Sequence, residues 1–205
     1  MRGVLGHRAM TLIYHDAWYQ TVAGVVTAAI LVLPLLPMAA SMLAVARRRL
    51  GYGSAWAWRS AVLDVALLYG TVIPIWLTML PGGNREISLV PFRDMATMPT
   101  YQIVGNMLLL SALGFMAPIR FPAVASWIRT VLLVMAVSCA IETCQYVLPV
   151  GRVASVDDVL LNTAGGALAA LASRPWRVSK TLPIRSWTRY ESVVTTGNRS
   201  TARGG

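Results

Sequence analysis

Residues 128–148 read IRTVLLVMAVSCAIETCQYVL, an apolar stretch that is interrupted near its end by one carboxylate, Glu142. A mostly apolar stretch of roughly 18 or more residues is long enough to cross a bilayer as a helix. Four other stretches of the chain have the same character. We therefore predict an all-α fold, an integral membrane helical bundle with about five transmembrane helices. The expected spans are Val22–Ala46, Ala61–Leu80, Tyr101–Ile119, Ile128–Leu148 and Asp157–Ser173.

The composition agrees with a membrane protein. Of the 205 residues, 56% are hydrophobic and 13% are charged, and the formal net charge is +10. Such a charge can indicate nucleic-acid binding, but no nucleic-acid motif and no basic, aromatic face accompanies it. The arginines and lysines gather instead in short segments beside the apolar stretches. We expect a lipid bilayer around the protein and no nucleic acid as a partner.

The placement of the positive charges predicts the orientation. Thirteen Lys and Arg residues lie on one side of the predicted spans and five on the other. The side with more positive charge is usually cytoplasmic. We therefore expect a multi-pass plasma-membrane protein with its N-terminus outside the cell and its C-terminus in the cytoplasm.

The chain is expected to have three parts. Residues 1–60 contain an N-terminal segment, the first span and a basic cytoplasmic loop, and residues 61–173 form the transmembrane core. Residues 174–205 form a basic tail without apolar periodicity, which we expect to be disordered and to lie against anionic lipid. The first apolar stretch has no small-residue cleavage site before Arg47, so we interpret it as a span and not as a signal peptide. Pro34 and Pro37 should kink it.

Three spans carry a polar side chain at a similar depth. Asn106, Glu142 and Asn162 each lie five or six residues from the outer end of a span, about 7–9 Å deep at 1.5 Å per residue. Because amides and carboxylates are costly in hydrocarbon, a shared depth predicts that these side chains meet. Each also has a polar partner about one turn away on the same helix. These partners are Gln102, Gln145 and Asp158, respectively.

Two interpretations of these residues remain open. In one, they form a buried hydrogen-bond cluster that fixes helix packing, with Arg152 paired to Asp157 or Glu142. In the other, they form an outward-facing site for a ligand or a reaction. Glu142 and Asp158 are then the candidate catalytic acid or base. The candidate ligand-binding residues are Asn106, Gln102, Gln145, Arg152, Asp157 and Asn162. Asp157 and Asp158 are also suited to capping the helix that they begin.

No motif points to a metal or another cofactor, and we expect none. Acidic side chains near the outer face offer oxygen ligands, but their spacing matches no defined metal motif. His7 and His15 have no ligand pattern, and phosphate loops and dinucleotide fingerprints are absent. Cys139 and Cys144 point about 140° apart on one helix, so they should not pair. We expect Asp64 to pair with Arg59 or with the Arg47–Arg49 run.

The polar residues resemble the pattern of the VanZ-like membrane proteins. The matching stretches are Leu89-Val90-Pro91-Phe92, Gly105-Asn106, Glu142-Thr143-Cys144-Gln145, and then Arg152, Asp157-Asp158, Asn162 and Gly165. Ser88 stands where the family often has Asn, and Ala112-Leu113-Gly114 replaces a frequent Pro-x-Gly. The resemblance covers roughly Ser88–Ala172 and identifies residues 61–173 as a VanZ-like core.

The resemblance implies a role in the cell envelope, because the family is named for a protein that raises resistance to teicoplanin-type glycopeptides. We favour a module that binds or shields a cell-surface ligand, such as a lipid-linked wall precursor or a glycopeptide. The alternative is a membrane-embedded enzyme that uses carboxylate acid–base chemistry on a lipid-linked or membrane-surface substrate. Transport is less favoured, since the inner halves of the first two spans are apolar apart from Asp64 and no inverted repeat is visible.

Overall fold

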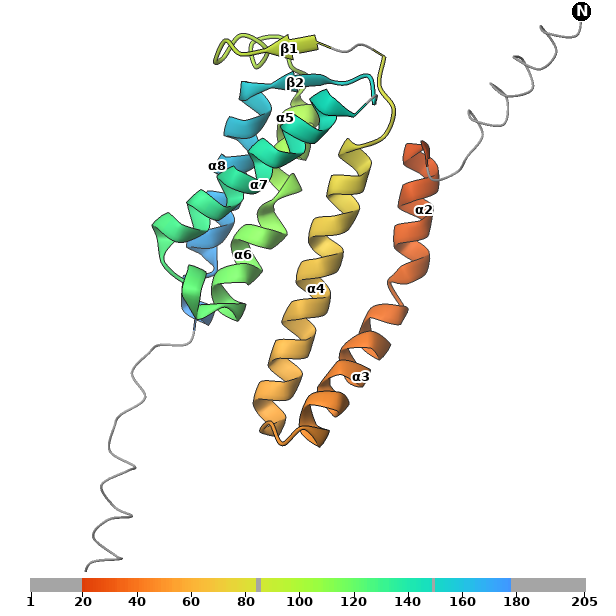
Figure 1. The fold of residues 1–205 in the computed structure, drawn as a ribbon, viewed down its shortest axis with the longest axis vertical. Coiled ribbons are helices and arrows are strands. Elements are labelled where there is room, and N and C mark those ends of the chain that lie inside the picture. The colour runs from red at the N-terminus through yellow and green to blue at the C-terminus, as the bar shows by residue number, and fades with distance from the viewer. Residues whose placement is uncertain (1–19, 84–85, 149, 178–205) are drawn as a thin grey trace, which may run out of the picture.

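A computed structural model describes residues 20–83, 86–148 and 150–177. This part of the protein is a helical bundle with almost no sheet (Figure 1), which confirms the predicted all-α membrane bundle. His7, His15, Arg85 and the tail from residue 178 onward lie outside the described residues. In chain order the elements are α2 (Val22–Val32), α3 (Leu35–Arg49), α4 (Ser54–Thr78), β1 (Glu86–Ser88), α5 (Thr100–Leu109), α6 (Ser111–Arg120), the 3-10 turn η2 (Pro122–Val124), α7 (Trp127–Val147), β2 (Val153–Ser155), α8 (Val156–Ala172) and the 3-10 turn η3 (Arg174–Trp176).

The helices supply three to four candidate membrane spans, where the sequence predicted about five. In the described chain, α4, the α5–α6 pair and α7 are each long and apolar enough to cross a membrane, and the bent α2–α3 pair adds a fourth if it counts as one span. The predicted fifth span corresponds to α8, which has 17 residues. At 1.5 Å per residue α8 is about 26 Å long. It is therefore somewhat shorter than a hydrocarbon core of about 30 Å.

Two of the candidate spans are interrupted. The axes of α2 and α3 differ by 49° at the break that contains Pro34, which confirms the predicted kink. Proline removes a helical N–H donor and its ring crowds the preceding turn, so a bend is expected there. The second break lies at Leu110, between α5 and α6, where φ is −110° and ψ is 14°. No proline or glycine occupies that position, and the sequence did not predict the break.

Helix α8 packs against α5, α6 and α7, on the side of the bundle away from α2 and α3 (Figure 1). Glycine allows the closest of these approaches. A Cβ atom on Gly165 would overlap the carbonyl oxygen of Met107 on α5, and one on Gly114 of α6 would overlap the carbonyl oxygen of Gly166. The Gly165-Gly166 stretch thus permits close helix packing.

One end of the bundle is closed by a short parallel ribbon that the sequence did not predict. Strands β1 and β2 pair in the register Glu86↔Val153, Ile87↔Ala154 and Ser88↔Ser155. The ribbon joins the connection between α4 and α5 to the connection between α7 and α8 (Figure 1). It thereby brings the residues after β1 next to the start of α8. We call this the ribbon end of the bundle.

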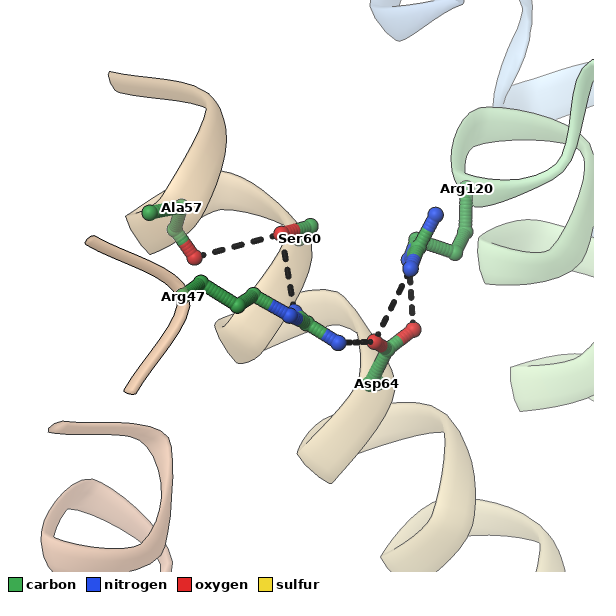
Figure 2. Close-up of polar contacts among 5 residues, drawn as sticks. All are labelled: Arg47, Ala57, Ser60, Asp64 and Arg120. Carbon is green, nitrogen blue, oxygen red and sulfur yellow. Dashed lines mark hydrogen bonds and ion pairs between the residues drawn. The ribbon is translucent and has the colours of Figure 1, made fainter. Parts of the chain in front are cut away.

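The opposite end carries an ion cluster around Asp64, which we call the arginine end. Figure 2 shows Asp64 between two guanidinium groups, with Arg47 Nη2 at 2.5 Å from Oδ2 and Arg120 Nε at 2.5 Å from Oδ1. The predicted pairing of Asp64 with the Arg47–Arg49 run is therefore confirmed through Arg47. The alternative prediction, that Asp64 pairs with Arg59, is wrong, because Arg59 Nη2 donates to the carbonyl oxygen of Trp176 at 2.7 Å. Arg120 was not predicted, since only the fold brings α6 beside α4.

Candidate functional site

Glu142 lies on α7 about one and a half turns from the end of the helix, and its side chain is only 8% exposed. Its Oε2 atom accepts a hydrogen bond from the backbone N–H of Ser155 at 3.0 Å. Ser155 ends β2 and caps α8, so this bond ties α7 to the ribbon and to the start of α8. Within the described residues, Oε1 of Glu142 has no hydrogen-bond partner. A donor from outside this part of the chain can therefore bind there.

A groove of about 280 Å³ lies beside Glu142, between α7, the ribbon and the first turn of α8. Its walls are mainly apolar, and Glu142 is the charged residue among those that line it. The lining residues are Ile87, Leu89, Cys139, Glu142, Thr143, Tyr146, Ala154, Ser155, Val156 and Val159. A mostly apolar groove with one acidic group suits a ligand that has both an apolar part and a polar hydrogen-bond donor.

The second candidate acid, Asp158 on α8, is hydrogen-bonded to a residue of α5. Its Oδ1 atom accepts a hydrogen bond of 2.5 Å from the Asn106 amide on α5. The negative charges of Asp158 and Glu142 act on each other, and the positive charge of Arg152 acts on both. The two carboxylates therefore belong to one electrostatic site, although different helices hold them.

Arg152 does not pair as the sequence predicted. Its Nε donates to the carbonyl oxygen of Leu80 at 3.2 Å, and it forms no ion pair with any carboxylate of the described chain. Arg152 thus binds the backbone directly after α4 and does not make the expected contact with Asp157 or Glu142. The guanidinium of Arg152 remains within electrostatic range of Glu142. Arg152 therefore lowers the net negative charge around the groove without forming an ion pair with Glu142.

Asp157 binds the loop that follows β1. Its carboxylate is fully buried and accepts backbone N–H bonds from Phe92, Asp94 and Met95 at 2.6, 3.0 and 3.0 Å. The N-cap of α8 is instead Ser155, whose Oγ accepts a hydrogen bond from the Asp157 N–H at 3.2 Å. The carboxylate of Asp157 therefore does not cap its own helix, as the sequence had suggested, but fixes a neighbouring loop.

The remaining predicted residues form separate contacts. The amide of Asn162, which is 1% exposed, donates from α8 to Ser138 Oγ on α7 at 2.9 Å. The amide of Gln145 donates to the carbonyl oxygen of Thr78 at 3.0 Å and so satisfies the end of α4. Gln102 is exposed on α5, and its side chain makes no hydrogen bond within the described ranges. These contacts resemble the polar links that hold helices together in membranes.

The structure thus divides the predicted cluster. Glu142 and Asp158 share an electrostatic environment with Asn106 and Arg152. Gln145 and Asn162 bind other partners, and the Gln102 side chain makes no hydrogen bond within the described residues. No group of three or more His, Cys, Asp or Glu side chains in the described chain is arranged to hold a metal ion. Both cysteines are exposed and free. The candidate site therefore consists of the groove, Glu142 and the neighbouring Asp158–Asn106 pair.

Sequence reasoning missed two serines of this region. Ser155 contacts Glu142 through its N–H, and its hydroxyl donates to Asp94 Oδ2 at 2.7 Å. Its position immediately before Val156-Asp157-Asp158 is typical of an N-cap and was a usable signal. Ser138, the partner of Asn162, lies four residues before Glu142 and hence on the same face of α7.

Asp94 is a third residue that the sequence did not connect with the site. The hydroxyls of Ser88 and Ser155 hold the pKa of its carboxyl below the usual value of 3.8 by stabilising the charged form. Asp94 therefore remains ionised beside the ribbon and adds to the negative charge at this end. No pattern in the sequence joined it to residues more than sixty positions away.

The model of the VanZ/LLP1 family matches residues 62–177, which is more than half of the chain. The chain belongs to the VanZ/LLP1 family. No curated protein and no solved structure matches it. The VanZ/LLP1 region contains all residues that line the groove, the ribbon and both candidate acids, whereas α2 and α3 precede it. The resemblance deduced from the sequence motifs is confirmed.

Proposed function

We propose that this VanZ-like membrane protein binds the membrane-proximal part of an amphipathic cell-surface molecule in the groove beside Glu142, and so holds or shields that molecule. A lipid-linked wall precursor and a glycopeptide of the teicoplanin type are the ligands that we favour. The observation that carries the proposal is the position of Glu142, a buried carboxylate on a membrane helix that faces a groove and, among the described residues, has a hydrogen-bond partner for Oε2 alone.

The physical cost of that position supports a ligand. A carboxylate buried in apolar surroundings is strongly disfavoured unless hydrogen bonds satisfy it. The Ser155 N–H satisfies one oxygen of Glu142, and a hydroxyl, amide or ammonium group of a ligand would satisfy the other. The apolar side chains around it would hold an acyl chain or another apolar part. A ligand that has both a polar donor and an apolar part would gain binding free energy from each.

The size of the groove limits what can enter. Pockets for drug-sized ligands usually measure about 300–1,000 Å³, and this groove measures about 280 Å³. It therefore suits one segment of a large molecule, and a whole glycopeptide would leave most of its surface outside. We infer that the remainder of the ligand rests against the ribbon and the loop that follows β1.

The charge distribution supports an outward-facing groove. Among the described residues, the arginine end carries eight arginines and a single acid, whereas the ribbon end carries two arginines and five acids. Positive charge favours the cytoplasmic side, so the ribbon end is expected to face outward. The exposed Arg48 and Arg49 would then lie near the inner leaflet, where anionic lipid attracts basic residues.

The test is genetic and uses conservative variants. A deletion strain is complemented with the wild-type protein, with Glu142→Gln or with Glu86→Gln, which changes an exposed carboxylate at the same end. We expect the strain complemented with Glu142→Gln to be as sensitive to teicoplanin as the deletion strain, despite normal membrane levels, and Glu86→Gln to behave as wild type. Unchanged teicoplanin susceptibility of the deletion strain would contradict a role in glycopeptide resistance.

The interacting carboxylates favour an enzyme as the second candidate. Glu142 and Asp158 act on each other electrostatically, and the Asn106 amide orients one of them, as acid–base chemistry on a lipid-linked substrate would need. The two functions differ in their product. Incubation of the purified protein with a lipid-linked precursor should leave its mass unchanged if the protein only binds it. A new product that disappears in Glu142→Gln would establish the enzyme instead.

A further inference from the structure

The loop after β1 exposes large apolar side chains at the ribbon end. Leu89, Val90 and Phe92 are 76%, 54% and 67% exposed, although the helices of the bundle offer apolar surface nearby. These residues belong to the Leu89-Val90-Pro91-Phe92 element, to which the proposed function assigns only contact with the outer part of the ligand and, through Leu89, with the groove. An exposed apolar cluster on an irregular loop is unfavourable in water and calls for a partner.

The backbone of the same loop is satisfied from within the protein. Asp157 accepts the N–H bonds of Phe92, Asp94 and Met95. The N–H of Arg93 donates to the carbonyl oxygen of Val90 at 3.4 Å, and Pro91 has no N–H. Every N–H from position 91 to position 95 is therefore either absent or paired inside the molecule.

This combination distinguishes lipid from water as the surroundings of the loop. In water, the N–H groups of an exposed turn would bond to solvent and would need no buried carboxylate. In lipid, unpaired backbone groups cost several kcal/mol each, so irregular backbone enters the membrane only where the protein satisfies it. A fully buried Asp157 that pairs three N–H groups beneath an apolar tip meets that requirement.

We propose that Leu89–Phe92 is an interfacial loop that inserts its apolar side chains into the leaflet at the ribbon end, with Asp157 as the internal acceptor for the backbone of Phe92 and of Asp94 and Met95 directly after it. The loop borders apolar surface of α7, because Leu89 lines the groove together with Tyr146, and Val147 beside Tyr146 is also well exposed. The exposed Arg93, which follows the tip, is placed to reach the lipid phosphates. This inference does not depend on the proposed ligand.

Site-directed spin labelling measures the depth of the loop directly. The full chain, with Cys139→Ala and Cys144→Ala, receives a nitroxide through Val90→Cys or, as a matched control, through Thr97→Cys, which is exposed in the same loop. Each protein is reconstituted into phosphatidylcholine vesicles, and collisions with oxygen and with a water-soluble nickel chelate are compared. We expect several-fold fewer nickel collisions and more oxygen collisions at position 90 than at position 97.

Two results would overturn the proposal. Equal nickel accessibility at the two positions would place the apolar tip in water. Protection of position 90 from both oxygen and nickel would show that protein covers it, either a second copy or another part of the chain. Because this measurement uses the loop with its native Asp157, it does not depend on whether a destabilised variant folds.

A pair of neighbouring substitutions tests the role of Asp157. Asp157→Asn leaves fewer acceptors for the three N–H groups, and we expect the label at position 90 to become as nickel-accessible as the label at position 97. Asp158→Asn alters the adjacent carboxylate, which binds Asn106 and not the loop, and should leave the label buried. An unchanged depth in Asp157→Asn would refute the part of the proposal that assigns the backbone acceptor to Asp157.

Discussion

The two ends of the bundle use carboxylates in different ways. At the arginine end, Asp64 is paired with two guanidinium groups, so its negative charge is more than neutralised. At the ribbon end, Asp157 and Glu142 accept hydrogen bonds from backbone N–H groups, and neither forms an ion pair within the described ranges. Backbone N–H groups satisfy a carboxylate geometrically but supply only partial positive charge.

The difference shows where the molecule keeps charge available for a partner. Arg47 and Arg120 also lie over the ring of Trp56, at 5.6 and 5.7 Å from its centre, so the groups around Asp64 satisfy one another. Among the described residues, the ribbon end holds five acids and two arginines, and Glu142 has a hydrogen-bond partner there for only one of its oxygens. A ligand that offers hydrogen-bond donors would therefore find an available acceptor at the ribbon end.

The largest expected effect concerns the sides of the membrane that these ends face. In a chain without its native cysteines, Thr97→Cys at the ribbon end should react with an impermeant thiol reagent in intact cells, because the excess of arginines should hold the other end inside. Ser54→Cys, exposed in the first turn of α4 at the arginine end, should react only after permeabilisation. The reverse labelling pattern would invert the orientation and place the groove in the cytoplasm.

The second expected effect compares the stability that each carboxylate provides. Asp157→Ala leaves three backbone N–H groups without their acceptor, and each unsatisfied buried donor costs about 1–3 kcal/mol. We therefore expect unfolding in bicelles to become easier by about 3 kcal/mol or more. Asp64→Ala leaves partly exposed guanidinium groups that water can solvate, and its cost should be nearer 1 kcal/mol. Equal losses for the two variants would remove the distinction between the two ends.

Much of this fold could be predicted from the sequence because length and hydropathy are properties of one segment at a time. The apolar stretches predicted the helices, and Pro34 predicted the bend. The ribbon could not be predicted in this way. It pairs two loops separated by three helices, and a three-residue strand such as β1 has no distinctive pattern of its own.

For the site, the sequence predicted a common depth but not the direction of each side chain. Counting residues placed Asn106, Glu142 and Asn162 at one level, yet each makes its hydrogen bond to a different partner. A contact also requires that two side chains face each other around their helix axes. In helices that are apolar on most sides, the sequence gives little information about that rotation, so Asn162 reached Ser138 and not Glu142.

A third and smaller effect should follow from Arg120→Lys. The guanidinium of Arg120 contacts both oxygens of Asp64, with Nε at 2.5 Å from Oδ1 and Nη2 at 3.1 Å from Oδ2. A lysine keeps the charge but cannot reproduce this planar, bidentate contact. We expect a loss of about 0.5–1 kcal/mol in the free energy of unfolding, in the range of exposed ion pairs. Arg129→Lys, which alters an exposed arginine at the same end, is the control and should be close to neutral.

The smallest effect is a pH dependence at the ribbon end. Because the Ser88 and Ser155 hydroxyls lower the pKa of Asp94 in the folded protein, its ionised form stabilises the fold at any pH above its usual value of 3.8. That contribution is lost as the pH falls from this value through the lower pKa of the folded state. Replacing Asp94 by Asn removes the titrating group. The melting temperature of wild type should therefore fall more steeply than that of Asp94→Asn as the pH is lowered from 5 toward 3, in roughly the acid window where carboxylates titrate.

Glu86→Gln, at an exposed carboxylate on the same ribbon, should follow the wild-type curve more closely than Asp94→Asn does. Parallel melting curves for wild type and Asp94→Asn would show that the hydroxyls of Ser88 and Ser155 do not stabilise the charged form, and that the charge of Asp94 adds no stability to the ribbon end.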